Sequence, residues 1–174
     1  MATLRDRLQP ALLDRLTDLE PQSRVEADDV RVMNKSQIRE AVLRDLSWLL
    51  NAVSPIGRQA DAHAQVADSV LNYGLPPMSG QMASRIDVSL LERTIKQAIL
   101  RFEPRVMSDT LEVRALDASS VLDTHNVIEF EIRGLMWAQP VPLELLLRTQ
   151  VDLEAGQVEV RDASSATPLR ARRE

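Results

Sequence analysis

The spacing of the apolar residues changes once along this chain of 174 residues, near Pro104. Before that proline the apolar residues recur every three or four positions, which is the period of an amphipathic α-helix. After it they alternate with polar residues, which is the period of a strand with one buried face. Helices that precede strands in this way predict an α+β fold, with N-terminal helices packed on one face of a mostly antiparallel C-terminal sheet.

The clearest helix is predicted over residues 35–52. Asn34 is a suitable N-cap, and Gln37 lies three residues further on, which is the spacing of a capping box. An apolar stripe follows at helical spacing, formed by Ile38, Val42, Leu46, Leu49 and Val53. We therefore expect this helix to bury the stripe, with Leu46 in the core, and to end before Pro55.

Two further helices are predicted. One begins after the N-cap Asp87 and ends at Phe102, because a residue that precedes a proline is driven out of the α region. The other, Ala11–Leu19, follows Pro10 and carries leucines at helical spacing. Between the two long helices, Gly74 indicates a defined turn with a positive φ.

The second half of the chain predicts four strands with one buried face each. Their alternating segments are Leu111 to Ala115, Ile128 to Ile132, Leu145 to Val151, and Val158 to Val160. A short turn at 154–157 joins the last two as a hairpin. The domain organisation predicted from these patterns is an N-terminal amphipathic segment and linker at 1–33, one domain at 34–161, and a disordered tail at 162–174.

The composition argues against several classes of function. There is no cysteine, and the two histidines, His63 and His125, lie in different contexts without acidic residues at metal-ligand spacing. A net charge of −5 and only five aromatic residues do not suit a nucleic-acid binder. No catalytic residue, cofactor or metal site is predicted, and neither membrane insertion nor a signal peptide is indicated. We therefore expect a cytoplasmic protein that is not an enzyme.

One charged segment is distinctive, because Glu103 and Arg105 flank Pro104 at the end of a predicted helix. The proline restricts the backbone, so both charged side chains can project from a fixed base toward a partner protein. The alternative is a local ion pair at a helix C-terminus. The residues alone do not decide between these two interpretations.

Three motifs together resemble a known family. Arg39-Glu-Ala-Val-Leu-Arg-Asp-Leu-Ser-Trp-Leu-Leu-Asn51 resembles the family's helix ending in Leu-Leu-Asn, and Ser69-Val-Leu-Asn-Tyr-Gly-Leu-Pro76 resembles its Tyr-Gly-Leu-Pro turn. Phe102-Glu-Pro-Arg105 resembles its Glu-Pro-Arg segment. In order and spacing, the chain resembles the TssE family of type VI secretion baseplate subunits, which is similar to the gene-25-like or lysozyme-like wedge proteins of phage tails. The chain departs from the family after Asn51, where an arginine is common.

The resemblance implies a structural role in a contractile, phage-tail-like injection machine. Its partners would be TssF-like and TssG-like wedge subunits, a TssK-like baseplate subunit, and sheath subunits, at the cytoplasmic side of the inner membrane. In the family, the segment that corresponds to Glu103, Pro104 and Arg105 docks into the baseplate, and the C-terminal strands can start the sheath by strand addition.

Two more candidate contacts follow. Leu12 and Leu16 lie on the predicted N-terminal helix, whose apolar stripe could pack on its own domain or on a partner. The resemblance implies that the strands around 143–161, which include Val158 and Val160, pair with the sheath. If the strand of Val158 is the open edge, a proline at Val158 would remove a donor for that pairing.

The alternative to a structural role is a lysozyme-like peptidoglycan hydrolase, which needs two carboxylates about 5–10 Å apart. Glu103 would be the acid, with Asp109 or Asp87 as its partner. Arg105 opposes this role, because it would favour the ionised form of Glu103. A third interpretation is an adaptor that works outside any secretion machine.

Overall fold

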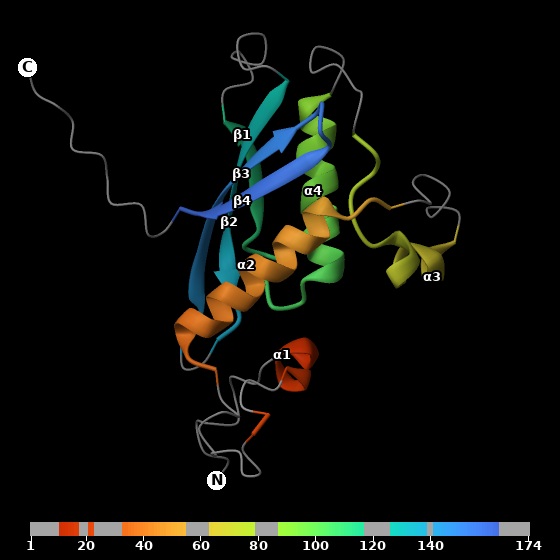
Figure 1. Ribbon diagram of the computed structural model, residues 1–174. Coiled ribbons are helices and arrows are strands. Elements are labelled where there is room, and N and C mark those ends of the chain that lie inside the picture. The colour runs from red at the N-terminus through yellow and green to blue at the C-terminus, as the bar shows by residue number, and fades with distance from the viewer. Residues whose placement is uncertain are drawn as a thin grey trace, which may run out of the picture.

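Four consecutive strands form one antiparallel sheet, and two long helices lie against its apolar face, as the computed structural model shows (Figure 1). The structure describes residues 11–17, 21–22, 33–54, 63–78, 87–116, 126–138 and 141–163. In chain order, the elements of this part are α1 (Leu12–Leu16), α2 (Lys35–Asn51), α3 (Ala64–Ala67), η4 (Val70–Asn72), α4 (Val88–Phe102), β1 (Glu112–Leu116), β2 (Val127–Met136), β3 (Leu143–Asp152) and β4 (Gln157–Asp162). The predicted α+β class, with helices first and the sheet second, is confirmed.

The strands are arranged in the order β1-β2-β3-β4, so each strand pairs with its neighbour in sequence. The register places Phe130 opposite both Ala115 on β1 and Thr149 on β3. Thr149 in turn lies opposite Val160 on β4. Because side chains alternate along a strand, this row belongs to the buried face, and the charged residues between occupy the other face.

The helices divide the buried face between them. Helix α2 contacts β4, α4 contacts β1, and the two helices contact each other. Leu46 and Ile99 are fully buried at the centre of this layer, against Phe130 and Leu147 from the sheet. The prediction that Leu46 belongs to the core is therefore confirmed.

Local signals in the sequence determine where the two long helices begin and end. The backbone N–H of Gln37 donates to the side chain of Asn34 at 2.9 Å, and the N–H of Asn34 donates to the side chain of Gln37 at 2.8 Å. This is the predicted capping box. Asp87 accepts a hydrogen bond from the N–H of Leu90 at 3.0 Å, and α4 ends at Phe102, as predicted.

The turn that follows η4 lies against the end of α2. Gly74 has a φ of 114°, which confirms the predicted positive φ. A Cβ atom at this position would lie 2.3 Å from the carbonyl oxygen of Ala52, so only glycine fits. Leu75 then donates to that same carbonyl at 2.9 Å.

The ends of the chain differ in part from the prediction. The helix predicted at Ala11–Leu19 is limited to Leu12–Leu16, and residues 18–20 lie outside the described residues. Strand β4 includes Asp162, the first residue of the predicted tail, while residues 164–174 lie outside the described part. His125 and most of the linker before residue 33 also lie outside it. Within the described residues, no helix is long and apolar enough to cross a membrane.

Candidate functional site

The segment from Glu103 to Met107 leaves α4 and is fastened to the end of β2. The N–H of Glu103 donates to the carbonyl of Ile99 and so completes the last turn of α4. The carbonyl of Arg105 then accepts from the N–H of Trp137 at 2.7 Å, and Met107 donates to Leu135 at 2.8 Å. The turn at Pro104 is therefore held between a helix end and a strand end, which positions its side chains.

Glu103 and Arg105 bind each other. Glu103 is buried, with 4% of its surface exposed, and accepts three hydrogen bonds from Arg105. The Nε atom of Arg105 lies 2.6 Å from Oε1, Nη2 lies 2.5 Å from Oε2, and the backbone N–H lies 3.1 Å from Oε1. The guanidinium thus grips both carboxylate oxygens, which is the strongest arrangement available to this pair.

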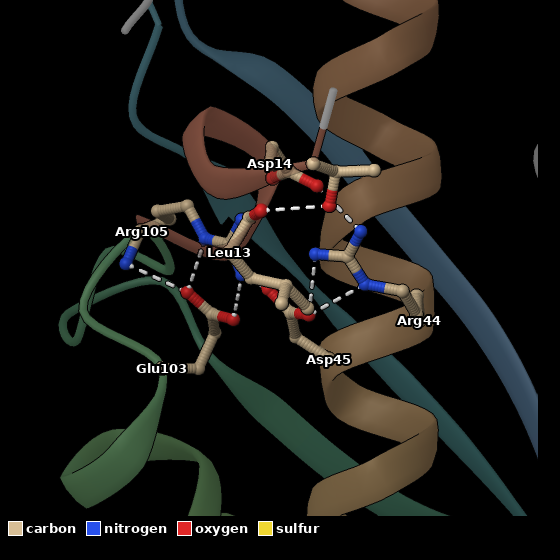
Figure 2. Close-up of polar contacts among 7 residues, drawn as sticks. Leu13, Asp14, Arg44, Asp45, Glu103 and Arg105 are labelled. Atoms are coloured by element: carbon tan, nitrogen blue, oxygen red, sulfur yellow. Dashed lines mark hydrogen bonds and ion pairs between the residues drawn. The ribbon is translucent and has the colours of Figure 1, made fainter. Parts of the chain in front are cut away.

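The pair continues into a network that joins three elements (Figure 2). Nη2 of Arg105 also lies 2.5 Å from Oδ2 of Asp45 on α2. The other oxygen of Asp45 accepts from Nε of Arg44 at 2.9 Å, and Nη1 of Arg44 lies 2.5 Å from Asp14 on α1. We call Glu103, Arg105, Asp45, Arg44 and Asp14 the ion-pair network; it alternates in sign along its length.

Electrostatics keep the two arginines of this network charged. Burial disfavours the charged guanidinium of Arg105, but the hydrogen bonds and charges of Glu103 and Asp45 outweigh burial and raise its pKa above the ordinary value. For Arg44, the hydrogen bond to Asp14 is the largest cause, and it also raises the pKa. Both guanidinium groups are therefore held in their charged form by their acidic partners.

This geometry decides between the two interpretations of the segment. The two side chains do not both project toward a partner, because Glu103 is buried and the pair is satisfied within the chain. The local ion pair is the arrangement found, because the turn at Pro104 brings residues 103 and 105 to the same side. Of the three residues, Pro104 is the exposed one, and Arg105 keeps 26% of its side chain accessible.

A hollow of about 450 Å³ opens beside the pair. It is lined by Ala11, Asp45, Leu49, Tyr73, Phe102, Glu103, Pro104 and Arg105. The rings of Tyr73 and Phe102 meet edge to face, with 5.3 Å between their centroids. Burial, followed by the charges of Asp45 and Glu103, raises the pKa of Tyr73. The hollow thus combines an aromatic floor with a charged wall, which suits the entry of a partner side chain.

The apolar residues of α1 are exposed rather than packed. Leu12 and Leu16 are 71% and 73% exposed, and no residue of α1 is buried. Asp14 connects the helix to Arg44, whose guanidinium lies 5.2 Å from the ring centre of Trp48. The role of Leu12 and Leu16 in binding a partner remains a prediction, and their exposure leaves both side chains available for such a contact.

The strand predicted to pair with the sheath is an edge strand, but its two valines differ. Strand β3 is paired on both sides, so only β4 has an edge in the predicted stretch. The N–H of Val158 donates to Oδ1 of Asn51 at 2.9 Å, and its carbonyl accepts from Nδ2 at 2.7 Å. The expectation that Val158 offers a free donor is therefore wrong, whereas nothing in the described residues binds the outward backbone groups of Val160.

The carboxylates considered for glycoside hydrolysis lie in different surroundings. Asp87 caps the N-terminus of α4, whereas Glu103 follows its C-terminus, about 24 Å away at the rise of an α-helix. Asp109 is exposed in the turn after Met107. Glu103 itself accepts three hydrogen bonds from Arg105, so both of its carboxylate oxygens are engaged within the chain.

Several residues of these surfaces were not foreseen. Asp45 and Arg44 were assigned no contact, because periodicity shows only that they lie off the apolar stripe. Asn51 was noted as a motif residue with no contact assigned to it. Its partner Val158 is 107 residues away, and no local pattern reports such a pairing.

Comparison with known proteins agrees with the motifs. Residues 36–141 match the family model described as baseplate wedge protein gp25. The matched residues run from α2 past the end of β2 and include the segment 103–105. No curated protein and no solved structure gives a significant match. Because the matched span covers more than half of the 174 residues, the chain belongs to the baseplate wedge protein gp25 family.

Proposed function

We propose that this chain is a structural subunit of a bacterial type VI secretion baseplate and not an enzyme. In this role it binds TssF-like and TssG-like wedge subunits, lies near a TssK-like subunit on the cytoplasmic side of the inner membrane, and helps to initiate the sheath. Family membership supports a baseplate role. The TssE-like order of the three motifs supports the type VI assignment.

The observation that carries the wedge-binding part is the rigid turn at Pro104. Its backbone is held by α4 on one side and by Trp137 on the other, while Glu103 and Arg105 hold each other. Because these groups are already fixed, little conformational entropy remains to be lost when a partner binds. Exposed Pro104 and the adjoining hollow supply the surface that such a partner would contact.

Helix α1 supplies a second candidate contact. Leu12 and Leu16 are adjacent on the helix surface because they are four residues apart. Two exposed leucines on a short helix suit docking into an apolar groove of another protein. We assign this surface to a baseplate partner, and its position next to the ion-pair network makes one continuous binding face.

The proposed contact with the sheath uses the edge of β4. A strand that adds to a sheet edge binds through main-chain hydrogen bonds, and the edge must offer outward N–H and C=O groups. Val160 offers these groups, and its side chain is partly buried against the core. We therefore place the sheath contact at Val160 rather than at Val158.

A pair of substitutions at Pro104 tests wedge binding. Replacement of Pro104 by Trp adds bulk at the mouth of the hollow but leaves the ion-pair network intact. Pro104→Ala is the matched control, because it loses the same backbone restriction without adding bulk. We expect both variants to melt alike, and the Trp variant to bind co-expressed wedge subunits about tenfold less than the Ala variant.

Equal binding by the two variants would contradict a docking role for this turn. The segment 103–105 would then act only within the chain, as a staple between α4, α2 and β2. If both variants lose binding and their melting is unchanged, binding depends on the backbone conformation that proline imposes.

A further inference from the structure

The side chain of Asn51 occupies the position that a neighbouring strand would take beside β4. Its Oδ1 accepts from the N–H of Val158, and its Nδ2 donates to the carbonyl of the same residue. The N–H and C=O of one residue in an added antiparallel strand would make the same two bonds. The amide of Asn51 is thus a one-residue substitute for a fifth strand.

The position of this amide is fixed from both sides. Nδ2 also donates to the carbonyl of Ser47, one turn earlier on α2, at 2.8 Å. The helix beneath it is anchored by the buried side chains of Leu46, Leu49 and Leu50. Asn51 therefore does not swing freely over the edge, and its bonds to Val158 cost little additional ordering.

The register shows what Asn51 leaves open. Val158 and Val160 lie opposite Val151 and Thr149, and outward-facing residues alternate along an antiparallel strand. Val160 is thus the next residue whose N–H and C=O face away from β3. Beyond it, the carboxylate of Asp162 is bound by Nε of Arg39 at 3.0 Å. Helix α2 thus contacts the edge on both sides of Val160.

The opposite edge of the sheet has a related contact. The N–H of Ala115 on β1 donates to Oε1 of Glu92 on α4 at 2.6 Å. Each long helix thus extends a polar side chain to the edge strand on its own side. Exposed strand edges otherwise promote association between copies, and proteins restrict them by such means.

We propose that Asn51 guards the edge of β4 against pairing with a second copy of this chain, so that Val160 is the first position open to an added strand. Two copies could pair about a two-fold axis with Val158 opposite the partner copy's Val160, which would give four main-chain hydrogen bonds. With Asn51 in place this register is blocked, because the N–H and C=O of Val158 are already bound. The guard itself does not depend on the proposed function; the use of Val160 by a sheath strand does.

The test measures self-association of the isolated full-length protein by sedimentation velocity over a range of concentrations. Asn51→Ala removes both bonds to Val158. Gln97→Ala is the matched control, since it removes an exposed amide on α4. We expect the control to sediment as the unsubstituted protein does, and Asn51→Ala to dimerise with an association constant at least about tenfold higher.

Two more variants make the result specific to the β4 edge. Val160→Pro combined with Asn51→Ala removes the second outward N–H and should abolish the new dimer, because proline cannot donate to an added strand. Asn51→Asp keeps the acceptor for Val158 but loses the donor, and should dimerise to an intermediate extent. It also serves as the test variant if Asn51→Ala does not fold.

Amide hydrogen exchange supplies an independent readout in the monomer. The amide of Val158 should exchange at least about tenfold faster in Asn51→Ala than in Gln97→Ala, since its acceptor is lost. The proposal is wrong if Asn51→Ala and Asn51→Asp remain as monomeric as the control. It is equally wrong if the dimer persists in the variant that also carries Val160→Pro. Neither result bears on wedge binding, which the Pro104 variants test separately.

Discussion

The buried carboxylate of Glu103 is bound by Arg105, two residues further along the chain, with 2.6 Å between Nε and Oε1. Asp45 on α2 binds the same guanidinium through Nη2. The polar connection between the end of α4 and the middle of α2 is therefore made by one arginine. Its loss would leave Glu103 buried without a counter-charge.

We expect Arg105→Ala to lower the free energy of unfolding by about 2–4 kcal/mol, because it leaves a buried carboxylate unpaired. Arg105→Lys should recover only part of this, since an ammonium cannot grip two oxygens as a guanidinium does. Urea unfolding measures both. Arg93→Ala on the exposed face of α4 is the control and should unfold as the original chain does. An Arg105→Ala variant of unchanged stability would mean that the pair contributes nothing to the fold.

Leu46 is fully buried between the sheet and α4. Leu46→Ala should therefore cost about 2–5 kcal/mol, as large-to-small changes in a core do. Leu90, which is 49% exposed on α4, provides the comparison. Leu90→Ala should change the unfolding free energy by less than about 1 kcal/mol. A similar small loss at Leu46 would show that the core face of α2 had been wrongly assigned.

Replacement by alanine should destabilise the protein strongly at Gly74 and only slightly at Gly134. At Gly74 the new Cβ would lie 2.3 Å from the carbonyl oxygen of Ala52 at a φ of 114°, so we expect a loss of more than about 3 kcal/mol. At Gly134 the nearest atom would be Cα of Leu111 at 3.5 Å, an ordinary contact. Gly134→Ala should stay within about 1 kcal/mol of the original chain. Thermal melts of the two variants decide the matter.

Val160→Pro should reduce sheath assembly while wedge subunits still co-purify, because it removes an outward N–H without breaking the β3–β4 ladder. Val160→Thr keeps that N–H and the branched side chain, and should assemble sheath normally. Counting fluorescent sheaths in cells that carry each variant gives the comparison. If a folded Val160→Pro variant forms a normal number of sheaths, the β4 edge is not used to initiate the sheath.

We expect no release of soluble fragments when the purified protein is incubated with peptidoglycan, because Glu103 is committed to Arg105 and lies a helix length from Asp87. Glu103→Gln serves as the control for any background. Turnover that disappears in this variant would favour the hydrolase alternative and contradict a purely structural role.

The elements of the fold could be predicted from the sequence because their signals are local. Asn34 and Gln37 specify the start of α2, and Pro104 specifies the end of α4, each within a few residues. The alternation of Ile128, Phe130 and Ile132 is likewise a property of one strand. Such signals are present before any tertiary contact is formed.

The surfaces were predicted less completely because they depend on residues far apart in sequence. Asp45 and Arg105 are separated by 60 positions, and Asn51 and Val158 by 107. The spacing of Glu103 and Arg105 is compatible with side chains that point outward or that bind each other. In the folded turn they bind each other. The leucines of α1 show the reverse case, in which a helical pattern does not produce a buried face.

The strand order also determines how the fold is completed during synthesis. Each strand pairs with the one made just before it, so the sheet can grow by successive hairpins as the chain emerges. Helix α2 is made early, but Asn51 receives its partner only when Val158 arrives, more than a hundred residues later. A chain that stops short of β4 would consequently present the bare edge of β3, a ten-residue strand, to every other nascent copy. Formation of the β3–β4 hairpin thus determines whether the edge of β3 is covered or remains open to association with other copies.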